Sequence, residues 1–251
     1  MQRYFLENVE VVNNSISIGG TDFHHIKNVM RMKEGSIVKV VDDEENAALV
    51  TIHYENKFVY GLMHERLESN DSKIQIKLAM ALIKKDKFEF CIQKSCECGA
   101  YEIHPFVSSR CVVKIADEKN DKKLDRWQKI ASEACEQSKN NHLCEIKPVI
   151  SFEEMLNEDA DLKLIAYENA DRIANNLASV CLKNKDINNV IVMIGPEGGF
   201  SEDEVKKAME HGYVCVSLGN SILRAETAAI CSINMLKYHY EILGDLYGVI
   251  K

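Results

Sequence analysis

From Ile74 onward, runs of apolar, β-branched residues alternate with runs whose apolar residues are three or four positions apart. The first kind predicts strands at Ile74–Ile83, Glu102–Val107, Leu162–Tyr167, 190–194 and 214–218. The second kind predicts helices at Lys85–Cys98, Asp121–Ser138, Arg172–Leu182, 202–211 and about 226–242. This alternation predicts an α/β fold, in which a mostly parallel sheet carries helices on both faces.

The first 70 residues have a different pattern. Three short apolar runs, Ser36–Val41, Ala47–Tyr54 and Phe58–Met63, are separated by short polar connections, and a short helix is predicted from Phe23 to Met32. Short strands at this spacing are typical of a small antiparallel barrel or sheet. The polar segment Glu65–Lys73 then predicts a domain boundary. We therefore expect one domain over residues 1–70 and a second over residues 73–251.

A glycine-rich segment, Gly195-Pro196-Glu197-Gly198-Gly199, follows the apolar run 190–194. The carboxyl ends of parallel strands share one edge of the sheet, where ligands bind in open α/β folds. Glycines there let a ligand approach the main chain closely. The segment lacks the Lys-Ser/Thr of a P-loop and the G-x-G-x-x-G of a dinucleotide fold. It therefore favours a nucleoside held by backbone groups over a phosphate, with a plain tight turn as the alternative.

A second segment, Leu218–Ala228, follows the apolar run Tyr213–Ser217 and should lie at the same edge. Ile222 and Leu223 are apolar residues in a predicted loop, so we expect them to pack either on a flat ligand or on the core. Arg224 stands at the predicted start of a helix, where the helix dipole disfavours a cation. Arg224 is therefore the residue of this segment that most needs a functional reason.

The net charge of −8 argues mildly against a nucleic-acid partner, but its distribution changes that conclusion. Residues 73–147 carry 15 Lys and Arg against 11 Asp and Glu, while the rest of the chain is acidic. A basic segment can bind phosphates whatever the total charge is, with a solvated surface as the alternative.

Two further features of the sequence bear on the cellular location and on metal binding. No apolar run is long enough to span a membrane, and the start lacks the apolar core of a secretory signal, so we expect a cytoplasmic protein. The nine cysteines lack the spacing of a zinc site, which predicts reduced, mostly buried thiols and no metal.

Motifs spread along the chain resemble those of the 16S ribosomal RNA uridine-N3 methyltransferase family (RsmE-like), within the SPOUT class of S-adenosylmethionine-dependent RNA methyltransferases. Besides the two loops they are His24-His25-Ile26, Val29-Met30-Arg31-Met32, Lys84-Lys85-Asp86-Lys87, Gln93-Lys94, Glu97-Cys98-Gly99, Ser109-Arg110-Cys111-Val112-Val113, Arg126-Trp127 and Glu133-Ala134-Cys135-Glu136-Gln137-Ser138. The resemblance implies an N-terminal PUA-like β-barrel that binds RNA. It also implies a C-terminal domain with a trefoil knot that holds the cofactor, and a homodimer. Lys139-Asn140 stands where the family usually has Gly-Arg, so Lys139 or His142 would replace that arginine only in part.

The resemblance also implies roles for individual residues. We expect Arg224 to stabilise the charge of a deprotonated uracil. Glu226 is a candidate proton acceptor or a group that orients Arg224, with helix capping as the favoured alternative. The cofactor pocket is expected to be formed by Gly195, Pro196, Glu197, Gly198, Gly199, Leu218, Gly219, Ile222, Leu223, Thr227 and Ala228. RNA contacts are expected from His25, Arg31, Lys84, Lys85, Lys87, Arg110 and Arg126, and we interpret Trp127 as a core residue.

The predicted function is methylation, by S-adenosylmethionine, of N3 of a specific uridine in the 16S RNA of the small ribosomal subunit. Two alternatives stay open. One is a SPOUT enzyme with another target, such as ribose 2′-O or pseudouridine N3. The other is a non-catalytic RNA-binding or ribosome assembly factor. The intact Gly195–Gly199 and Ile222–Ala228 loops favour an active pocket.

Overall fold

The computed structural model describes residues 2–6, 11–12, 15–42, 46–55, 58–67, 74–112, 120–140, 142–170 and 175–243. The chain divides into two compact units. One unit comprises Met1–Asp71 together with Cys135–Leu143, and the other comprises Ser72–Ala134 together with Cys144–Lys251.

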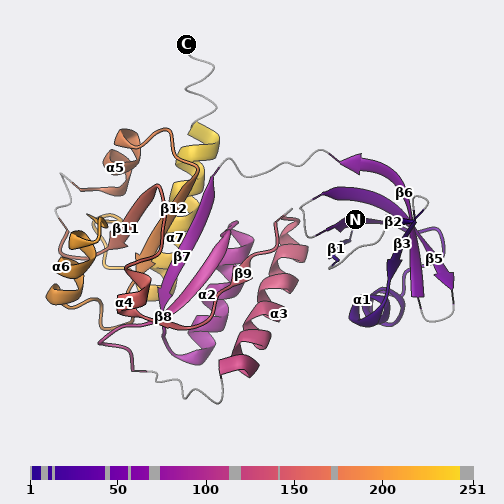
Figure 1. The fold of residues 1–251 in the computed structure, drawn as a ribbon, viewed down its shortest axis with the longest axis horizontal. Helices are drawn as coiled ribbons and strands as arrows, with labels where there is room; N and C mark the ends of the chain where they lie inside the picture. Colours follow the sequence, from indigo (N-terminus) through magenta and orange to yellow (C-terminus); the bar gives the residue numbers. More distant parts are fainter. Residues whose placement is uncertain are drawn as a thin grey trace, which may run out of the picture. The chain divides into compact units, whose positions relative to one another are not determined.

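Within the described residues, the N-terminal unit forms a six-stranded sheet, which Figure 1 shows as strongly curled. Its strands are β1 (Arg3–Phe5), β2 (Val11–Val12), β3 (Ser15–Ile18), β4 (Ile37–Val41), β5 (Ala47–Glu55) and β6 (Phe58–Leu67). Their order is β1-β4-β5-β6-β3-β2, with β1 parallel to β4 and the other neighbours antiparallel. Alternate apolar residues, such as Val38, Val50 and Ile52, point to one buried core.

Two predictions for this unit had the wrong bounds. The helix expected at Phe23–Met32 is instead α1 (Gly20–His24), which continues as a π-helical turn over His25–Val29. Strand β6 runs on to Leu67, so the start of the expected linker Glu65–Lys73 is strand. Glu65 and Arg66 pair with Leu49 and Ala48 of β5, which makes them part of the sheet. Residues 68–73 of the linker lie outside the described residues.

The second unit is built on seven strands in the part of the chain that is described. They are β7 (Gln75–Ala81), β8 (Glu102–Val107), β9 (Glu145–Ile146), β10 (Ile150–Ser151), β11 (Leu162–Ala166), β12 (Asn189–Ile194) and β13 (Val214–Val216). The order is β10-β8-β7-β12-β11-β13, with β9 beside β8, and the neighbouring strands are parallel. The predicted parallel sheet is therefore confirmed, but the two-residue strands β9 and β10 were missed.

Helices lie on both faces of this sheet, as predicted (Figure 1). They are α2 (Lys85–Glu97), α3 (Asn120–Ser138), α4 (Phe152–Met155), α5 (Leu177–Lys183), α6 (Glu202–Glu210) and α7 (Ala225–Lys237). Side chains of α4 and α6 join one buried cluster with β7 and β12, while α7 packs against the same strands and α2. A π-helical turn over Tyr238–Leu243 follows α7. None of the described helices is both long and apolar enough to cross a membrane.

Some details of the helices were predictable and others were not. Trp127 is buried and its ring lies 4.7 Å from that of Phe88, which confirms its place in the core. Gly99 follows the end of α2 with a φ of +87°, as expected for a C-terminal cap. The helix expected at Arg172–Leu182 begins only at Leu177, and residues 172–174 lie outside the described residues. All nine cysteines are described and are free thiols, six of them buried.

A polar cluster around the buried His104 lies at the amino ends of the parallel strands, opposite the edge that carries the glycine loop. Glu102 Oε2 is 2.9 Å from His104 Nε2, and Glu102 Oε1 is 3.3 Å from Lys147 Nζ. The hydrogen bond with His104 and the charge of Lys147 outweigh burial and lower the pKa of Glu102 to about 2. The cluster therefore stabilises the fold through an ionised carboxylate.

We expect Glu102→Gln to reduce the acid sensitivity of the fold. Because the folded pKa lies below the usual 4.5, ionised Glu102 contributes stability that is fully present above that pH and is lost as the pH falls toward about 2. Urea unfolding near neutral pH should show a deficit on the order of 2 kcal/mol for the variant. That deficit should shrink by more than half at about pH 3.

Glu145→Gln is the matched control, because Glu145 contacts the same Lys147 at 2.5 Å but is 58% exposed. We expect it to change the unfolding free energy by less than about 1 kcal/mol at either pH. A deficit for Glu102→Gln that is independent of pH would contradict this assignment.

Candidate functional site

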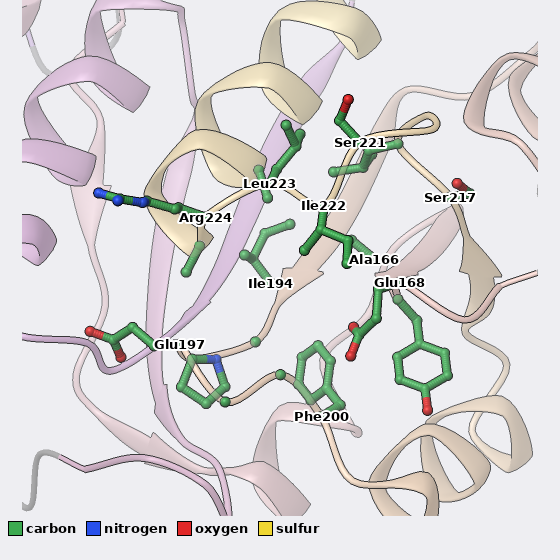
Figure 2. Close-up of a pocket in the computed structure, with 18 of the residues that line it drawn as sticks. Ala166, Glu168, Ile194, Glu197, Phe200, Ser217, Ser221, Ile222, Leu223 and Arg224 are labelled. Carbon is green, nitrogen blue, oxygen red and sulfur yellow. The ribbon is translucent and has the colours of Figure 1, made fainter.

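Three loops meet at the carboxyl edge of the parallel sheet and enclose a cavity of about 610 Å³ (Figure 2). They follow β11, β12 and β13, and β11 lies between the other two strands. Parallel pairing brings the ends of these strands to one edge, so segments far apart in the chain line one space. The volume is in the range of small-molecule binding sites.

The first loop, Gly195–Gly199, leaves the fully buried strand β12 and makes a tight turn. The amide of Gly199 donates a 2.9 Å hydrogen bond to the Pro196 carbonyl, and Gly199 has a φ of +65°. A Cβ built on Gly195 would lie 3.1 Å from the ring of buried Phe200. The glycines therefore allow a backbone path that places main-chain groups, with little side-chain cover, along the cavity.

The loop that follows β8, which is separate from the three cavity loops, supports the glycine loop through hydrogen bonds. Arg110 Nη1 donates a 2.9 Å hydrogen bond to the Gly198 carbonyl. Glu204, only 6% exposed, accepts 2.8 Å hydrogen bonds from the backbone amides of Ser109 and Ser201. Burial by itself would raise the pKa of Glu204, but these hydrogen bonds lower it below the usual range. The ionised carboxylate of Glu204 thus links the loop after β8 to the residue that follows Phe200 at the end of the glycine loop.

The second cavity loop precedes α7. Leu218, Leu223 and Ile222 line the cavity, but Ile222 is 81% exposed, so it does not pack on the core. Arg224 has an extended backbone and is the N-cap of α7, so it stands at the start of this helix, as predicted. Among the described residues its guanidinium has no hydrogen-bond or ion-pair partner, and Figure 2 shows it on the same side of the cavity as Glu197.

Glu226 and Lys87 form a pair beside this loop. Lys87 Nζ lies 3.7 Å from Glu226 Oε1, and Lys87 lines the cavity. Glu226 Oε2 is buried and has no hydrogen-bond partner. No side chain caps the start of α7. Glu226 lies in the first turn of α7, where the helix dipole favours a carboxylate, and it lies beside Lys87 as well.

Ten of the eleven residues expected to form the pocket line this one cavity, and Thr227 does not. The third loop was missed by sequence reasoning: Ala166, Tyr167 and Glu168 line the cavity from the end of β11. Its sequence signal was weak, because a charged residue such as Glu168 is ordinary after a predicted strand. Lys87 was expected to contact RNA, but it lines the cavity.

The other residues expected to contact RNA have different surroundings. In the N-terminal unit, Arg31 is exposed with a φ of +48°, and His25 Nδ1 lies 3.2 Å from the Tyr4 hydroxyl. Lys84 and Lys85 are exposed at the start of α2. Arg126 makes two 2.8 Å hydrogen bonds to the Glu89 carboxylate, so its guanidinium already has a partner. Lys139, at the position that departs from the family pattern, has a φ of +63°.

Comparison with known proteins identifies both parts of the chain. Residues 70–237 match a family described as RNA methyltransferase domain, and residues 18–58 match a family described as RNA methyltransferase PUA domain. Ribosomal RNA small subunit methyltransferase E of Bacillus subtilis is 35% identical over 98% of this chain and 100% of its own length. The protein of the same name from Mesomycoplasma hyopneumoniae is 32% identical over 92% of this chain and 96% of its own length.

Solved structures agree over nearly the whole chain. A ribosomal RNA small subunit methyltransferase E from Neisseria gonorrhoeae, bound to S-adenosylmethionine, has a TM-score of 0.83 and 28% identity, covering 96% of this chain and 98% of that one. A putative methyltransferase from Legionella pneumophila, in complex with the same cofactor, has a TM-score of 0.83 and 29% identity, covering 94% and 97%.

The backbone of Gly199 provides a test of the loop's geometry. Gly199→Ala should destabilise the protein by about 1–2 kcal/mol, because φ is +65° and the new Cβ would lie 3.1 Å from Glu168 Oε1. Gly198→Ala, in the same loop, would place its Cβ at ordinary contact distances from Arg110, 3.4 Å or more, so its cost should stay below about 1 kcal/mol. Thermal unfolding of both variants measures this, and equal losses would contradict the geometry.

Proposed function

Since this chain belongs to the ribosomal RNA small subunit methyltransferase E family, we propose that it transfers a methyl group from S-adenosylmethionine to N3 of one uridine in the 16S RNA of the small subunit. The observation that carries this proposal is the cavity between the Gly195–Gly199 and Leu218–Leu223 loops. Both segments were expected at a nucleoside site, and both line the same space.

The residues present fit the methyl donor. Ile194, Leu218 and Leu223 give the cavity apolar walls that suit an adenine ring, and the glycine loop offers backbone groups. No phosphate-binding pattern is present in the two loops, which agrees with a donor that has no phosphate. When bound, S-adenosylmethionine supplies a methyl group on a positively charged sulfur. The protein's part is to position that group and the acceptor in line.

Arg224 is the residue we assign to the acceptor. N3 of uracil lies on the base-pairing edge, so the base must be unpaired before a donor can reach it. Loss of the N3 proton places negative charge on O2 and O4 of the ring. The guanidinium of Arg224 is exposed at the cavity and has no partner among the described residues, so it is available to stabilise that charge.

Lys87 and Glu226 give the same wall of the cavity a second cation. Because Glu226 Oε1 is 3.7 Å from Lys87 Nζ, we assign Glu226 to positioning the Lys87 ammonium rather than to accepting the N3 proton. If the two act as a unit, Glu226→Gln combined with Lys87→Met should lower turnover no more than the worse single change does. Additive losses would contradict this coupling.

Binding of the RNA is assigned to both domains, which we place at residues 1–70 and 73–251. The match of residues 18–58 to a PUA domain of RNA methyltransferases supports contacts from the N-terminal domain, including His25 and Arg31. Exposed Lys84, Lys85 and Arg110 add positive charge to the catalytic domain. Phosphate contacts of this kind predict binding that weakens steeply as salt rises.

Three further properties follow the family resemblance. We propose that the N-terminal sheet closes as a barrel and that the C-terminal segment forms a trefoil knot; in support, the chain returns from edge strand β13 to pack α7 on the inner strands β7 and β12. We also propose a homodimer, supported by the exposed apolar side chains of Phe90, Met235 and Tyr238 on α2, α7 and the turn after α7. Sedimentation that gives only a monomer would count against the dimer. We place the protein in the cytoplasm, with the ribosomal subunits.

The direct test is transfer of a tritiated methyl group from S-adenosylmethionine to small ribosomal subunits from cells that lack this activity. We expect purified protein to label one uridine, and mass spectrometry to place the methyl group on N3. Labelling of a ribose 2′-O or of pseudouridine would reassign the target. Binding of RNA and cofactor without any transfer would identify an assembly factor instead.

In the same assay, Arg224→Ala should lower turnover about 10²- to 10³-fold, as expected for loss of a group that stabilises developing charge. Its affinity for S-adenosylhomocysteine should stay within a factor of about three, a change worth less than 1 kcal/mol. Lys206→Ala, which removes an exposed cation from α6, is the matched control and should behave as wild type. Normal turnover by Arg224→Ala would refute the role given to Arg224.

A further inference from the structure

Glu168 is the acidic residue that extends into the cavity from the loop after β11. Figure 2 shows its carboxylate directed toward the middle of the cavity, on the opposite side from Arg224. It lies against the glycine loop, because Oε1 is 3.1 Å from the position that a Cβ on Gly199 would take. Parallel pairing of β11 with β12 places the two loops side by side at one sheet edge.

Within the described part of the chain, no protein group occupies either oxygen of Glu168. Among the described residues, this carboxylate makes no hydrogen bond and no ion pair. Other acidic groups near the cavity have protein partners: Glu204 accepts backbone amides, and Glu226 lies beside Lys87. A carboxylate can accept several hydrogen bonds, so Glu168 has unused acceptor capacity that faces the cavity.

We propose that Glu168 accepts hydrogen bonds from the 2′- and 3′-hydroxyl groups of the donor's ribose. This proposal rests on the proposed function, because it assumes that the nucleoside of the methyl donor occupies the cavity. Two adjacent hydroxyl groups present two O–H donors, which a carboxylate can accept together. The arrangement resembles that of dinucleotide-binding folds, where an acidic residue binds the ribose beside a glycine loop. Here Glu168 and Gly199 lie in the loops that follow two neighbouring strands, with Oε1 of Glu168 3.1 Å from the position of a Cβ on Gly199.

The donor also has two cationic groups that a carboxylate could attract, the α-ammonium and the sulfonium. The three assignments predict different ligand dependence. A ribose contact is shared by S-adenosylmethionine, S-adenosylhomocysteine and 5′-methylthioadenosine. An ammonium contact is lost in 5′-methylthioadenosine, which lacks the amino-acid part, and a sulfonium contact exists only in S-adenosylmethionine.

Calorimetry on the full-length protein separates these assignments without an activity measurement. We expect Glu168→Ala to weaken S-adenosylhomocysteine and 5′-methylthioadenosine alike, by about tenfold to a hundredfold, as for lost hydrogen bonds to a charged group. The 2′-deoxy form of S-adenosylhomocysteine should bind the wild type about tenfold more weakly than the parent compound, and this penalty should disappear in Glu168→Ala.

Glu202→Gln is the matched control, since it removes an exposed carboxylate at the start of α6 that lies outside the cavity lining. It should bind all three compounds as the wild type does. A 2′-deoxy penalty that persists in Glu168→Ala, or a loss confined to ligands with the amino acid or the sulfonium, would overturn the ribose assignment. Failure of the wild type to bind any of the nucleosides would instead refute the proposed function.

Discussion

Burial of strand β12 on both faces is the constraint on which the rest of this structure depends. Val190, Val192 and Ile194 face one layer of helices, while Ile191 and Met193 face the other, and all five are almost completely buried. Because helices pack on both faces of β12, the position of its carboxyl end is fixed within the sheet. The glycine loop therefore begins at a defined place, between the ends of β7 and β11.

That fixed point determines how the site is built. The glycine loop is supported from behind by Phe200 and from the side by Arg110 and Glu204, so its main chain lines the cavity without long side chains of its own. The loops after β11 and β13 complete the cavity because their strands are parallel to β12. The site is thus formed by loops at the carboxyl edge of the sheet. The helices and the Glu102–His104 cluster stabilise the sheet that carries these loops.

The fold of the catalytic part was largely predictable because its apolar periodicity is strong and its strands are buried on both faces. The prediction failed where local signals are weak. Strands of two residues, such as β9 and β10, are too short to show any period. The polar residues Glu65 and Arg66 gave no sign of a strand, because they show no alternation of apolar and polar positions, and only the structure shows their pairing with Leu49 and Ala48 of β5.

The site divides in the same way. Glycines and apolar residues predicted two of the three cavity loops, because a cluster of glycines or exposed apolar residues is unusual in the loop after a strand. Glu168 carried no comparable signal, because an acidic residue after a strand is ordinary until the neighbouring loop is known. The pairing of Lys87 with Glu226 and of Arg126 with Glu89 joins residues distant in sequence, so spacing could not predict either.

We propose that loops from the ends of β11, β12 and β13 together hold the nucleoside of the methyl donor. A crystal structure of the protein with S-adenosylhomocysteine tests this most directly. We expect the nucleoside to lie between Gly195–Gly199 and Leu218–Leu223, with its ribose toward Glu168. Binding of the nucleoside outside this cavity would contradict it.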